Sequence, residues 1–386
     1  MTGHTSRTGL DTGRIWPPPA GGTSTPNGNE DPVVIRAVRD AVLGTGGPGR
    51  DLIIVIDGLG AAAAECFRSY TPRLRQLAAH AQTVRTLAPS TTATVLTSLL
   101  TGRSPLEHGV LGYSVFADAF GARTIAQLSG DPGISPAEWM PLQNLGQQAI
   151  AAGRSAAQVG PARYANSFLS AVMQRDWAFV QQRSVSHRVR AVESALHHAG
   201  ENGVVYLHLA EVDKAGHHCG PGSDPWLTAL EEADQLVGTL VRRLADRVRI
   251  TITADHGMVP TSRAHVVDLA DSPIGAEITG VAGEPRALSV RSSIEEPELV
   301  ERLQHAVSTR GHVMGRSELL ASGLLGDESS LTQHASARLG DAMIWARDCW
   351  ALTHSCFIAD AVLDQRGMHG SLTDEEMLIP LIQLNA

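Results

Sequence analysis

Aspartate and histidine side chains recur in this sequence where apolar runs end. Asp57 closes a run of β-branched residues, and Asp213 and Asp255 each follow another apolar run. His256 comes directly after Asp255, and His369 lies in a polar stretch near the C-terminus. Carboxylates and imidazoles are ligands of zinc and manganese, and several of them on adjacent strand ends would form a two-metal centre. The pattern therefore favours a metal site.

Each of these groups has a simpler interpretation when it is taken alone. An Asp-Gly pair such as Asp57-Gly58 after a strand is typical of a turn. Asp213 and His217 lie four residues apart, a spacing more often found in a helix cap or a surface pair than in ligands. Their recurrence at successive predicted strand ends favours the metal site over these alternatives.

A hydroxyl-rich segment, residues 89–102, is predicted to begin a helix near Thr91 or Thr92 and to end it at Gly102, a plausible C′ residue. Its apolar residues recur at helical spacing: Val95, Leu96, Leu99 and Leu100. A hydroxyl at a helix N-terminus lies near free N–H groups and the positive end of the dipole, which favour an alkoxide or a phosphoryl oxygen. Simple capping by Ser or Thr is the alternative.

The elements that must position these groups form an α/β pattern. Buried strands are predicted over residues 51–57, 204–210 and 248–254, with a helix of about 20 residues through 227–244 between the last two. Strand, helix and strand in this order imply a parallel crossover, and open α/β sheets place their sites at the carboxyl ends of the strands. A helix is expected over 61–69.

A closing strand is expected over residues 377–384. Pro380 within it suggests an edge position or an irregular start, because proline cannot donate to a sheet ladder.

Taken in order, these motifs resemble the alkaline phosphatase superfamily and, within it, the type I phosphodiesterase/nucleotide pyrophosphatase branch. The resemblance rests on Asp57-Gly, Pro-Ser-x-Thr through Thr-Gly to His108-Gly, Asp213-x-x-Gly-His217-x-x-Gly, Asp255-His256-Gly-Met and His369-Gly. It covers roughly residues 50–115, 204–260 and 365–384. It implies a three-layer α/β/α sandwich with a largely parallel sheet and an inserted cap.

The domain organisation that we expect has three parts. Residues 1–30 are rich in Gly, Thr, Pro and Ser and form a flexible leader. Residues 31–386 form the catalytic domain. Residues 259–365, which are less regular, form the cap within it.

The resemblance also assigns roles to single residues. One metal ion would be bound by Asp57, Asp255 and His256, and the other by Asp213, His217 and His369. Thr92 would be the nucleophile, forming a phosphothreonine intermediate, and its oxygen would also bind the Asp57 metal. The family usually uses two Zn²⁺ ions, with Mn²⁺ or Mg²⁺ as alternatives. Ser90 and Thr91 remain alternative nucleophiles.

The sequence departs from the nucleotide-hydrolysing pattern directly after the nucleophile. Ala93 and Val95 stand where an aromatic residue and an asparagine are usual, which puts a nucleotide preference in doubt. Substrate contacts are expected instead from the Ala93 backbone N–H, from Tyr113 and from Lys214, the single lysine of the chain. Tyr113 has the alternative of packing a turn, and Lys214 that of an exposed residue at a helix start.

Composition limits the possible function classes. The chain has 386 residues, of which 43% are hydrophobic and 18% charged, so it can bury a sizeable core. A net charge of −9 argues against binding of nucleic acid polymers. Four scattered cysteines and the lack of an apolar leader lead us to expect a cytoplasmic protein. No apolar run is long enough for a membrane span.

These observations predict a dimetal-dependent hydrolase that cleaves a phosphodiester or phosphoanhydride bond of a small phosphorylated molecule. The nearest alternative is a phosphomonoesterase or phosphonate hydrolase with the same site. A catalytically silent binding protein is a third possibility. The oligomeric state is left open.

Overall fold

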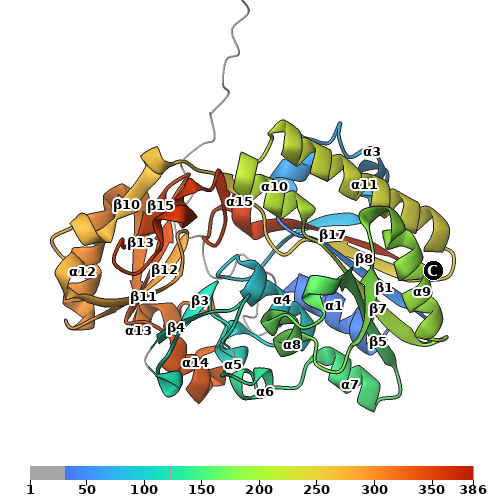
Figure 1. Ribbon diagram of the computed structural model, residues 1–386, viewed down its shortest axis with the longest axis horizontal. Coiled ribbons are helices and arrows are strands. Elements are labelled where there is room, and N and C mark those ends of the chain that lie inside the picture. The colour runs from blue at the N-terminus through green and yellow to red at the C-terminus, as the bar shows by residue number, and fades with distance from the viewer. Residues whose placement is uncertain (1–30, 122, 132, 386) are drawn as a thin grey trace, which may run out of the picture.

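The structure is a computed structural model that describes residues 31–121, 123–131 and 133–385. The leader predicted for residues 1–30 lies outside this part of the chain. A seven-stranded sheet forms the centre of the main body, and a smaller sheet lies beside it (Figure 1).

The central sheet is largely parallel, as expected. Its strands are, in spatial order, β2 (Ala81–Arg85), β17 (Leu378–Leu384), β8 (Arg249–Thr253), β1 (Asp51–Ile56), β7 (Gly203–Leu209), β5 (Ser155–Pro161) and β6 (Ala178–Gln182). Only β17 runs antiparallel to its neighbours. All six residues of β1 are buried, because helices cover both faces of the sheet.

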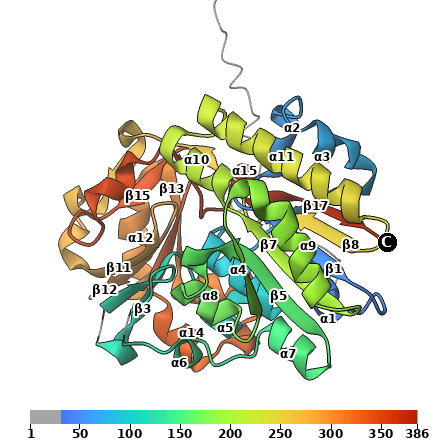
Figure 2. The same cartoon turned by 45° about the vertical axis from the view of Figure 1, so that its right-hand side comes forward.

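Helices pack on both faces of this sheet, which gives the three layers (Figure 2). One face carries α1 (Val33–Leu43), α4 (Thr92–Thr101), α7 (Leu145–Ala151) and α8 (Phe168–Met173), with the short helices α5 (Pro105–His108) and α6 (Pro136–Trp139) beside them. The other carries α2 (Ala61–Cys66), α3 (Pro72–Gln76), α9 (Arg188–His198), α10 (Glu211–Cys219) and α11 (Asp224–Leu244). The predicted α/β/α sandwich is thereby confirmed.

Most of the elements predicted around the site are present with small changes at their ends. The strands expected over 51–57, 204–210 and 248–254 are β1, β7 and β8, and the long helix between the last two is α11. The helix expected over 61–69 ends earlier, at Cys66. The crossover from β7 to β8 passes over β1, which lies between them in the sheet. This arrangement brings three strand ends together.

Pro380 does not lie on an edge strand, since β17 pairs with both β2 and β8. Pairing with β8 begins at Leu381, directly after the proline, so Pro380 is placed where its missing N–H is not needed for that ladder. Neither alternative for Pro380 is observed for β17 as a whole, because the strand is not at an edge and its register with β2 is continuous from Leu378 to Ile382. Three strands of the sheet, β2, β5 and β6, were not predicted.

The segment predicted as a cap forms a separate small subdomain. Its antiparallel sheet contains β11 (Ile278–Glu284), β12 (Ala287–Ser292), β14 (Ala342–Ala346) and β13 (Gly311–Gly315). Helices α12 (Glu296–Val307), α13 (Arg316–Ala321) and α14 (Gln333–Arg338) accompany it. The strand pair β10 (Val266–Asp268) and β15 (Ala351–Thr353) belongs to the same segment. A hydrophobic cluster of its own holds this unit together. That it closes over a substrate stays a prediction.

Shorter elements join the subdomain to the main body. They are the hairpin β3 (Ser114–Ala117) and β4 (Arg123–Ala126), the pair β9 (Val259–Pro260) and β16 (Gly367–Met368), and the helix α15 (Asp374–Met377). The C-terminal loop that carries His369 therefore runs between the two units before it enters β17.

A buried ion pair fastens the subdomain to this loop. Arg286 donates to both carboxylate oxygens of Glu376, at 3.0 and 2.7 Å, and both side chains are fully buried. Glu376 also accepts from the backbone of Ser371 at 3.0 Å and from the hydroxyl of Thr373 at 2.6 Å. The subdomain thus holds the turn that follows His369.

A second buried carboxyl, Glu284, lies at the same junction. It accepts the backbone N–H of Tyr113 at 2.6 Å, while its other oxygen has no hydrogen-bond partner. Burial raises the pKa of Glu284 to about 8, and the charge of Glu376 adds to this. The hydrogen bonds from Tyr113 and Thr91 act in the opposite direction. Burial at this junction therefore favours the neutral form of the Glu284 carboxyl.

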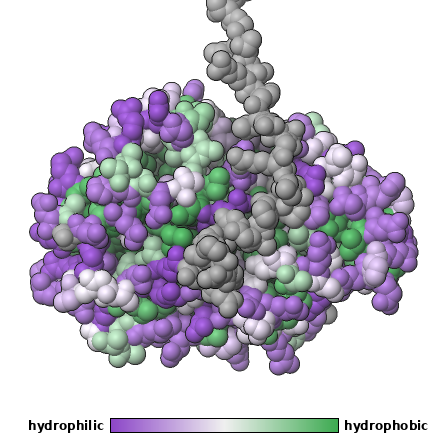
Figure 3. Space-filling model, turned by 180° about the vertical axis from the view of Figure 1, so that it is seen from behind, coloured by the Kyte–Doolittle hydropathy of each residue, from purple (hydrophilic) through white to green (hydrophobic). Residues whose placement is uncertain are grey.

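The surface view from behind shows mainly hydrophilic side chains, with apolar residues in small separate groups (Figure 3). Within the described residues, no helix combines the length and the apolar character that crossing a bilayer requires.

We predict that Arg286→Ala destabilises the protein by about 3–5 kcal/mol, because it leaves the Glu376 carboxylate buried and unpaired. Chemical denaturation followed by circular dichroism measures this change. Arg263→Ala is the control, since Arg263 makes an equally short ion pair with Asp360 but is 48% exposed. The control should change stability little. Equal losses in the two variants would contradict the role given to burial.

We also predict that Glu284 makes the protein less stable as the pH rises. Its pKa is about 8 in the folded protein and near 4.5 when unfolded, so its contribution is complete below about pH 4.5 and is lost as the pH rises through about 8. Relative to Glu284→Gln, the wild-type free energy of unfolding should fall by up to about 1.4 kcal/mol per pH unit between these limits. Parallel curves for the two proteins would refute this.

Candidate active site

The site lies at the carboxyl edge of three adjacent strands. Asp57 follows β1, Asp255 follows β8, and Asp213 lies in the first turn of α10, which follows β7. All three side chains are buried. Because parallel strands end at the same edge of a sheet, three distant segments place their carboxylates in one region.

Asp57, Asp255 and His256 form one group of possible ligands, called the Asp57 group below. Their ligand atoms all lie within 4.8 Å of one another. The Nε2 atom of His256 is 3.6 Å from Asp57 Oδ1 and 3.5 Å from Asp255 Oδ2. The hydroxyl of Thr92 lies 3.1 Å from the same Nε2 atom. The residues that the sequence assigned to one metal ion are therefore brought together.

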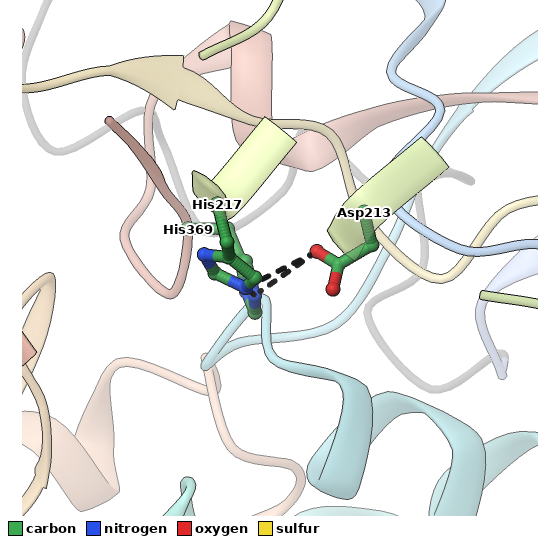
Figure 4. Close-up of side chains that lie close together, drawn as sticks. All are labelled: Asp213, His217 and His369. Atoms are coloured by element: carbon green, nitrogen blue, oxygen red, sulfur yellow. Dashed lines mark hydrogen bonds and ion pairs between the residues drawn. The ribbon is translucent and has the colours of Figure 1, made fainter. Parts of the chain in front are cut away.

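Asp213, His217 and His369 form the second group, the Asp213 group (Figure 4). Asp213 Oδ1 is 3.3 Å from His217 Nε2 and 3.6 Å from His369 Nε2, and the two imidazole nitrogens are 3.2 Å apart. The rings of His256 and His369, one from each group, stack with centroids 3.6 Å apart. The two groups are thus immediate neighbours.

Backbone carbonyls orient all three imidazoles in the same way. The Nδ1 atom of His256 is 2.9 Å from the oxygen of Gly257, that of His217 is 2.8 Å from Gly367, and that of His369 is 2.9 Å from Ser90. A carbonyl oxygen can only accept, so each Nδ1 carries the proton and each Nε2 presents a lone pair to the site. Metal-binding histidines are usually held in this manner.

The geometry and the unpartnered oxygens fit metal ions. The separations of 3.1–3.6 Å are close to the distance of about 3.3 Å between two ligands of a tetrahedral zinc ion, whose bonds are about 2.0–2.1 Å long. Asp57 Oδ1, Asp213 Oδ1 and Asp255 Oδ2 are buried and have no hydrogen-bond partner in the part of the chain that the structure describes. Buried carboxylate oxygens without donors are costly, and bound cations would supply the missing interaction.

The electrostatics of the site lead to the same conclusion. Burial raises the pKa of Asp57 well above its usual value, and repulsion from Asp213 and Asp255 adds to this. Burial likewise raises the pKa of Asp213 to about 6, against the attraction of His217. The pKa of His256 falls to about 3, mainly through burial, so its imidazole is neutral. Close carboxylates and neutral imidazoles are what a divalent cation requires.

Helix α4 begins at Thr92, one of the two starts that the sequence allowed. Thr91 has an extended backbone and makes no capping hydrogen bond with its side chain, and Gly102 ends the helix with a φ of 66°. The Ser90 hydroxyl donates to the carbonyl of Ser371, and the Thr91 side chain acts on Glu284 by lowering the pKa of that carboxyl. Of the three candidate nucleophiles, Thr92 is the one in contact with His256.

The three predicted substrate contacts have different surroundings. The Ala93 side chain is buried, so only its backbone is available to a ligand. The Tyr113 side chain is 44% exposed, and its backbone N–H donates to Glu284. Lys214 is exposed, donates to the hydroxyl of Tyr164 at 2.9 Å, and lowers the pKa of Asp57 and Asp213 through its charge. Lys214 therefore acts on the site electrostatically.

His208, which was not among the predicted site residues, lies beside Asp57 with its Nε2 atom 3.0 Å from Asp57 Oδ2. Tyr206 and His208 are two residues apart in β7 and so project to the same face of the sheet. Two polar rings at alternate positions of an otherwise apolar strand could have indicated from the sequence that His208 faces the site. By contrast, His108 uses both ring nitrogens within the fold, on Ser98 and Val110.

The structure has the fold of solved proteins of low sequence identity. It matches murine ectonucleotide pyrophosphatase/phosphodiesterase 5 in complex with AMP with a TM-score of 0.67 and 16% identity, covering 86% of this chain and 87% of the murine one. Phosphonoacetate hydrolase from Sinorhizobium meliloti, in complex with phosphonoacetate, matches with a TM-score of 0.66 and 17% identity. The match covers 87% of this chain and 90% of the hydrolase chain. These likenesses support the fold.

Two sequence relatives match over part of their length. A venom phosphodiesterase of Macrovipera lebetinus is 26% identical over 222 residues, which are 54% of this chain and 25% of the viper protein. The catalytic subunit of human GPI ethanolamine phosphate transferase 3 is 27% identical over 210 residues, which are 50% of this chain and 18% of the human protein. The chain therefore spans a quarter or less of the length of these relatives.

A family model decides the assignment, because it matches most of the chain. The model describes type I phosphodiesterases and nucleotide pyrophosphatases, and it matches residues 52–372. This range includes every residue of the Asp57 and Asp213 groups. The family is dimetal-dependent, in keeping with the two groups of possible ligands. The chain therefore belongs to the type I phosphodiesterase/nucleotide pyrophosphatase family.

Proposed function

We propose that this chain hydrolyses a phosphodiester or phosphoanhydride bond of a small molecule, using two divalent metal ions. The observation that carries the proposal is the contact between the Thr92 hydroxyl, at the first residue of α4, and His256, within two adjacent groups of ligands. A nucleophilic hydroxyl beside two cation sites is the arrangement that phosphoryl transfer requires.

The Asp57 group and Thr92 would hold one metal ion, and the Asp213 group the other. Zn²⁺ is the ion that we favour, because imidazoles make up half of the six carboxylate and imidazole ligands, whereas Mg²⁺ prefers oxygen ligands. When bound, such cations lower the pKa of a hydroxyl and offset the negative charge of phosphoryl oxygens.

Thr92 acts as the nucleophile in this proposal. Its Oγ1 atom gives up its proton to solvent and forms a bond to phosphorus, while the bond from phosphorus to the leaving oxygen breaks and its electron pair goes to that oxygen, which gives a phosphothreonine. Water then attacks the phosphorus, the bond to Oγ1 breaks, and the threonine hydroxyl is restored. The unpaired N–H groups at the start of α4, with that of Ala93 among them, favour a phosphoryl oxygen at this position.

Lys214 supports recognition of an anionic substrate. It lies next to Asp213 in the first turn of α10, and its ammonium group is paired with a neutral phenol, Tyr164 of the turn Ala162–Tyr164, instead of with a carboxylate. Because this contact is with a hydroxyl and not with a carboxylate, the Lys214 ammonium group can exchange the Tyr164 hydroxyl for a substrate phosphate. The AMP and phosphonoacetate bound by the two structural neighbours are likewise small and phosphorylated.

A phosphomonoesterase or phosphonate hydrolase is the second candidate. Ala93 offers no ring on which a nucleotide base could stack, and the phosphonoacetate hydrolase matches as well as the murine phosphodiesterase does. A catalytically silent binding protein is less favoured, since all six ligand residues and a hydroxyl are in place.

We predict that Thr92→Ala lowers turnover by about 10³-fold or more while both metal ions stay bound, because it removes the nucleophile and leaves six ligands. Metal content by mass spectrometry and kcat with an activated diester measure the two effects. Asp213→Ala is the comparison, and it should lose metal as well as activity. Undiminished turnover by Thr92→Ala would move the nucleophile to another residue.

We predict that kcat/KM for bis-p-nitrophenyl phosphate exceeds that for p-nitrophenyl phosphate by about tenfold or more, because the proposed reaction expels one ester oxygen from a diester. Phosphonoacetate and a dinucleoside polyphosphate complete the panel. Dominant turnover of the monoester or of phosphonoacetate would favour the second candidate. Absence of turnover with every substrate, together with less than one metal ion per chain, would favour the binding protein.

A further inference from the structure

The carboxylate of Asp57 is held by a side chain, whereas that of Asp255 is held by the backbone. Asp255 Oδ1 accepts the N–H groups of Gly58, at 3.1 Å, and of His256, at 3.0 Å. Its other oxygen is left without a donor. Asp57 likewise has one oxygen with a donor and one without, since Oδ2 is bonded to His208 at 3.0 Å and Oδ1 has no partner among the described residues.

The pairing of β1 with β7 determines this contact. The two strands run parallel with Val55 opposite His208, and the N–H of Asp57 donates to the carbonyl of Leu209 at 3.0 Å. The strand pairing therefore holds the backbones of Asp57 and His208 at positions from which their side chains meet. His208 is largely buried, and it reaches Asp57 from the neighbouring strand.

Both nitrogens of the His208 ring are used in this contact. A ligand carboxylate can only accept, so the Nε2–H of His208 donates to Asp57 Oδ2. The hydroxyl of Tyr206 lies 3.3 Å from Nδ1 and donates to it. Tyr206 is buried, and its ring stacks on that of His208. With both nitrogens engaged, His208 has no lone pair to offer a metal ion and is not itself a ligand.

We infer that His208 is a positioning residue that occupies one oxygen of Asp57, so that this carboxylate binds its metal ion through the other oxygen alone. Tyr206 supports it by orienting the ring. The inference rests on the two-metal site of the proposed function. If Asp57 binds through one oxygen only, Asp255, His256 and Thr92 can bind the same ion, which gives four ligands.

Partners of this kind set the affinity of a metal site without touching the ion. Loss of a group that orients a ligand usually weakens metal binding by about 10–100-fold. His208→Ala should therefore raise the dissociation constant of one Zn²⁺ ion by that factor and leave the other unchanged. His208→Gln keeps an N–H at the same reach and should restore most of the affinity. Tyr206→Phe should have a smaller effect than His208→Ala.

The experiment is a Zn²⁺ titration of the metal-free full chain against a competing chelator, repeated with Co²⁺, whose visible spectrum reports the coordination number. His218→Ala is the matched control, because His218 directly follows His217 in the chain but has an exposed side chain. Circular dichroism and thermal melting of the metal-free proteins show that each variant folds. We expect a changed Co²⁺ spectrum for His208→Ala alone.

Two results would overturn the inference while leaving the proposed function intact. One is a folded His208→Ala that binds both ions with wild-type constants and a wild-type Co²⁺ spectrum. The other is a folded His208→Gln that binds metal no better than His208→Ala. A wild-type chain that binds no metal ion would overturn the inference and the proposed function together.

Discussion

Three aspartate carboxylates are buried close together at the ends of adjacent strands, and the arrangement of the other elements follows from the need to accommodate their charge. Asp57, Asp213 and Asp255 repel one another, and burial raises the cost of their charges. The fold meets part of that cost with donors from the Gly58 and His256 backbone and from His208. Among the described residues the other oxygens have no donor, and the two metal ions of the proposed function would offset their charge.

The same constraint explains why the chain returns to the site from its C-terminal end. His369 comes from a loop that is not part of the carboxyl edge of the parallel strands, and its Nδ1 must reach the carbonyl of Ser90, next to α4. The subdomain holds the turn behind this loop through the pair of Arg286 and Glu376. The inserted subdomain therefore serves the site structurally, whatever it does to a substrate.

Sequence reasoning found the central strands and missed the outer ones for a physical reason. β1 is apolar throughout because helices cover both faces, which leaves an unmistakable pattern. β5 and β6 contain small and polar residues, and β2 is exposed over most of its length, so none has a clear period.

The amino-acid sequence alone sets the order and type of the donors. Carboxylates and imidazoles after apolar runs, and a hydroxyl-rich segment before a helix, are local patterns that marked the candidate groups, and the resemblance to a family assigned roles to six of these groups and to Thr92. Only the tertiary structure decided that β1 lies between β7 and β8, that His208 meets Asp57, and that Arg286 supports the His369 loop. These contacts join segments up to 198 residues apart, as Asp51 of β1 and Arg249 of β8 are, and burial, not any local pattern, selects such partners.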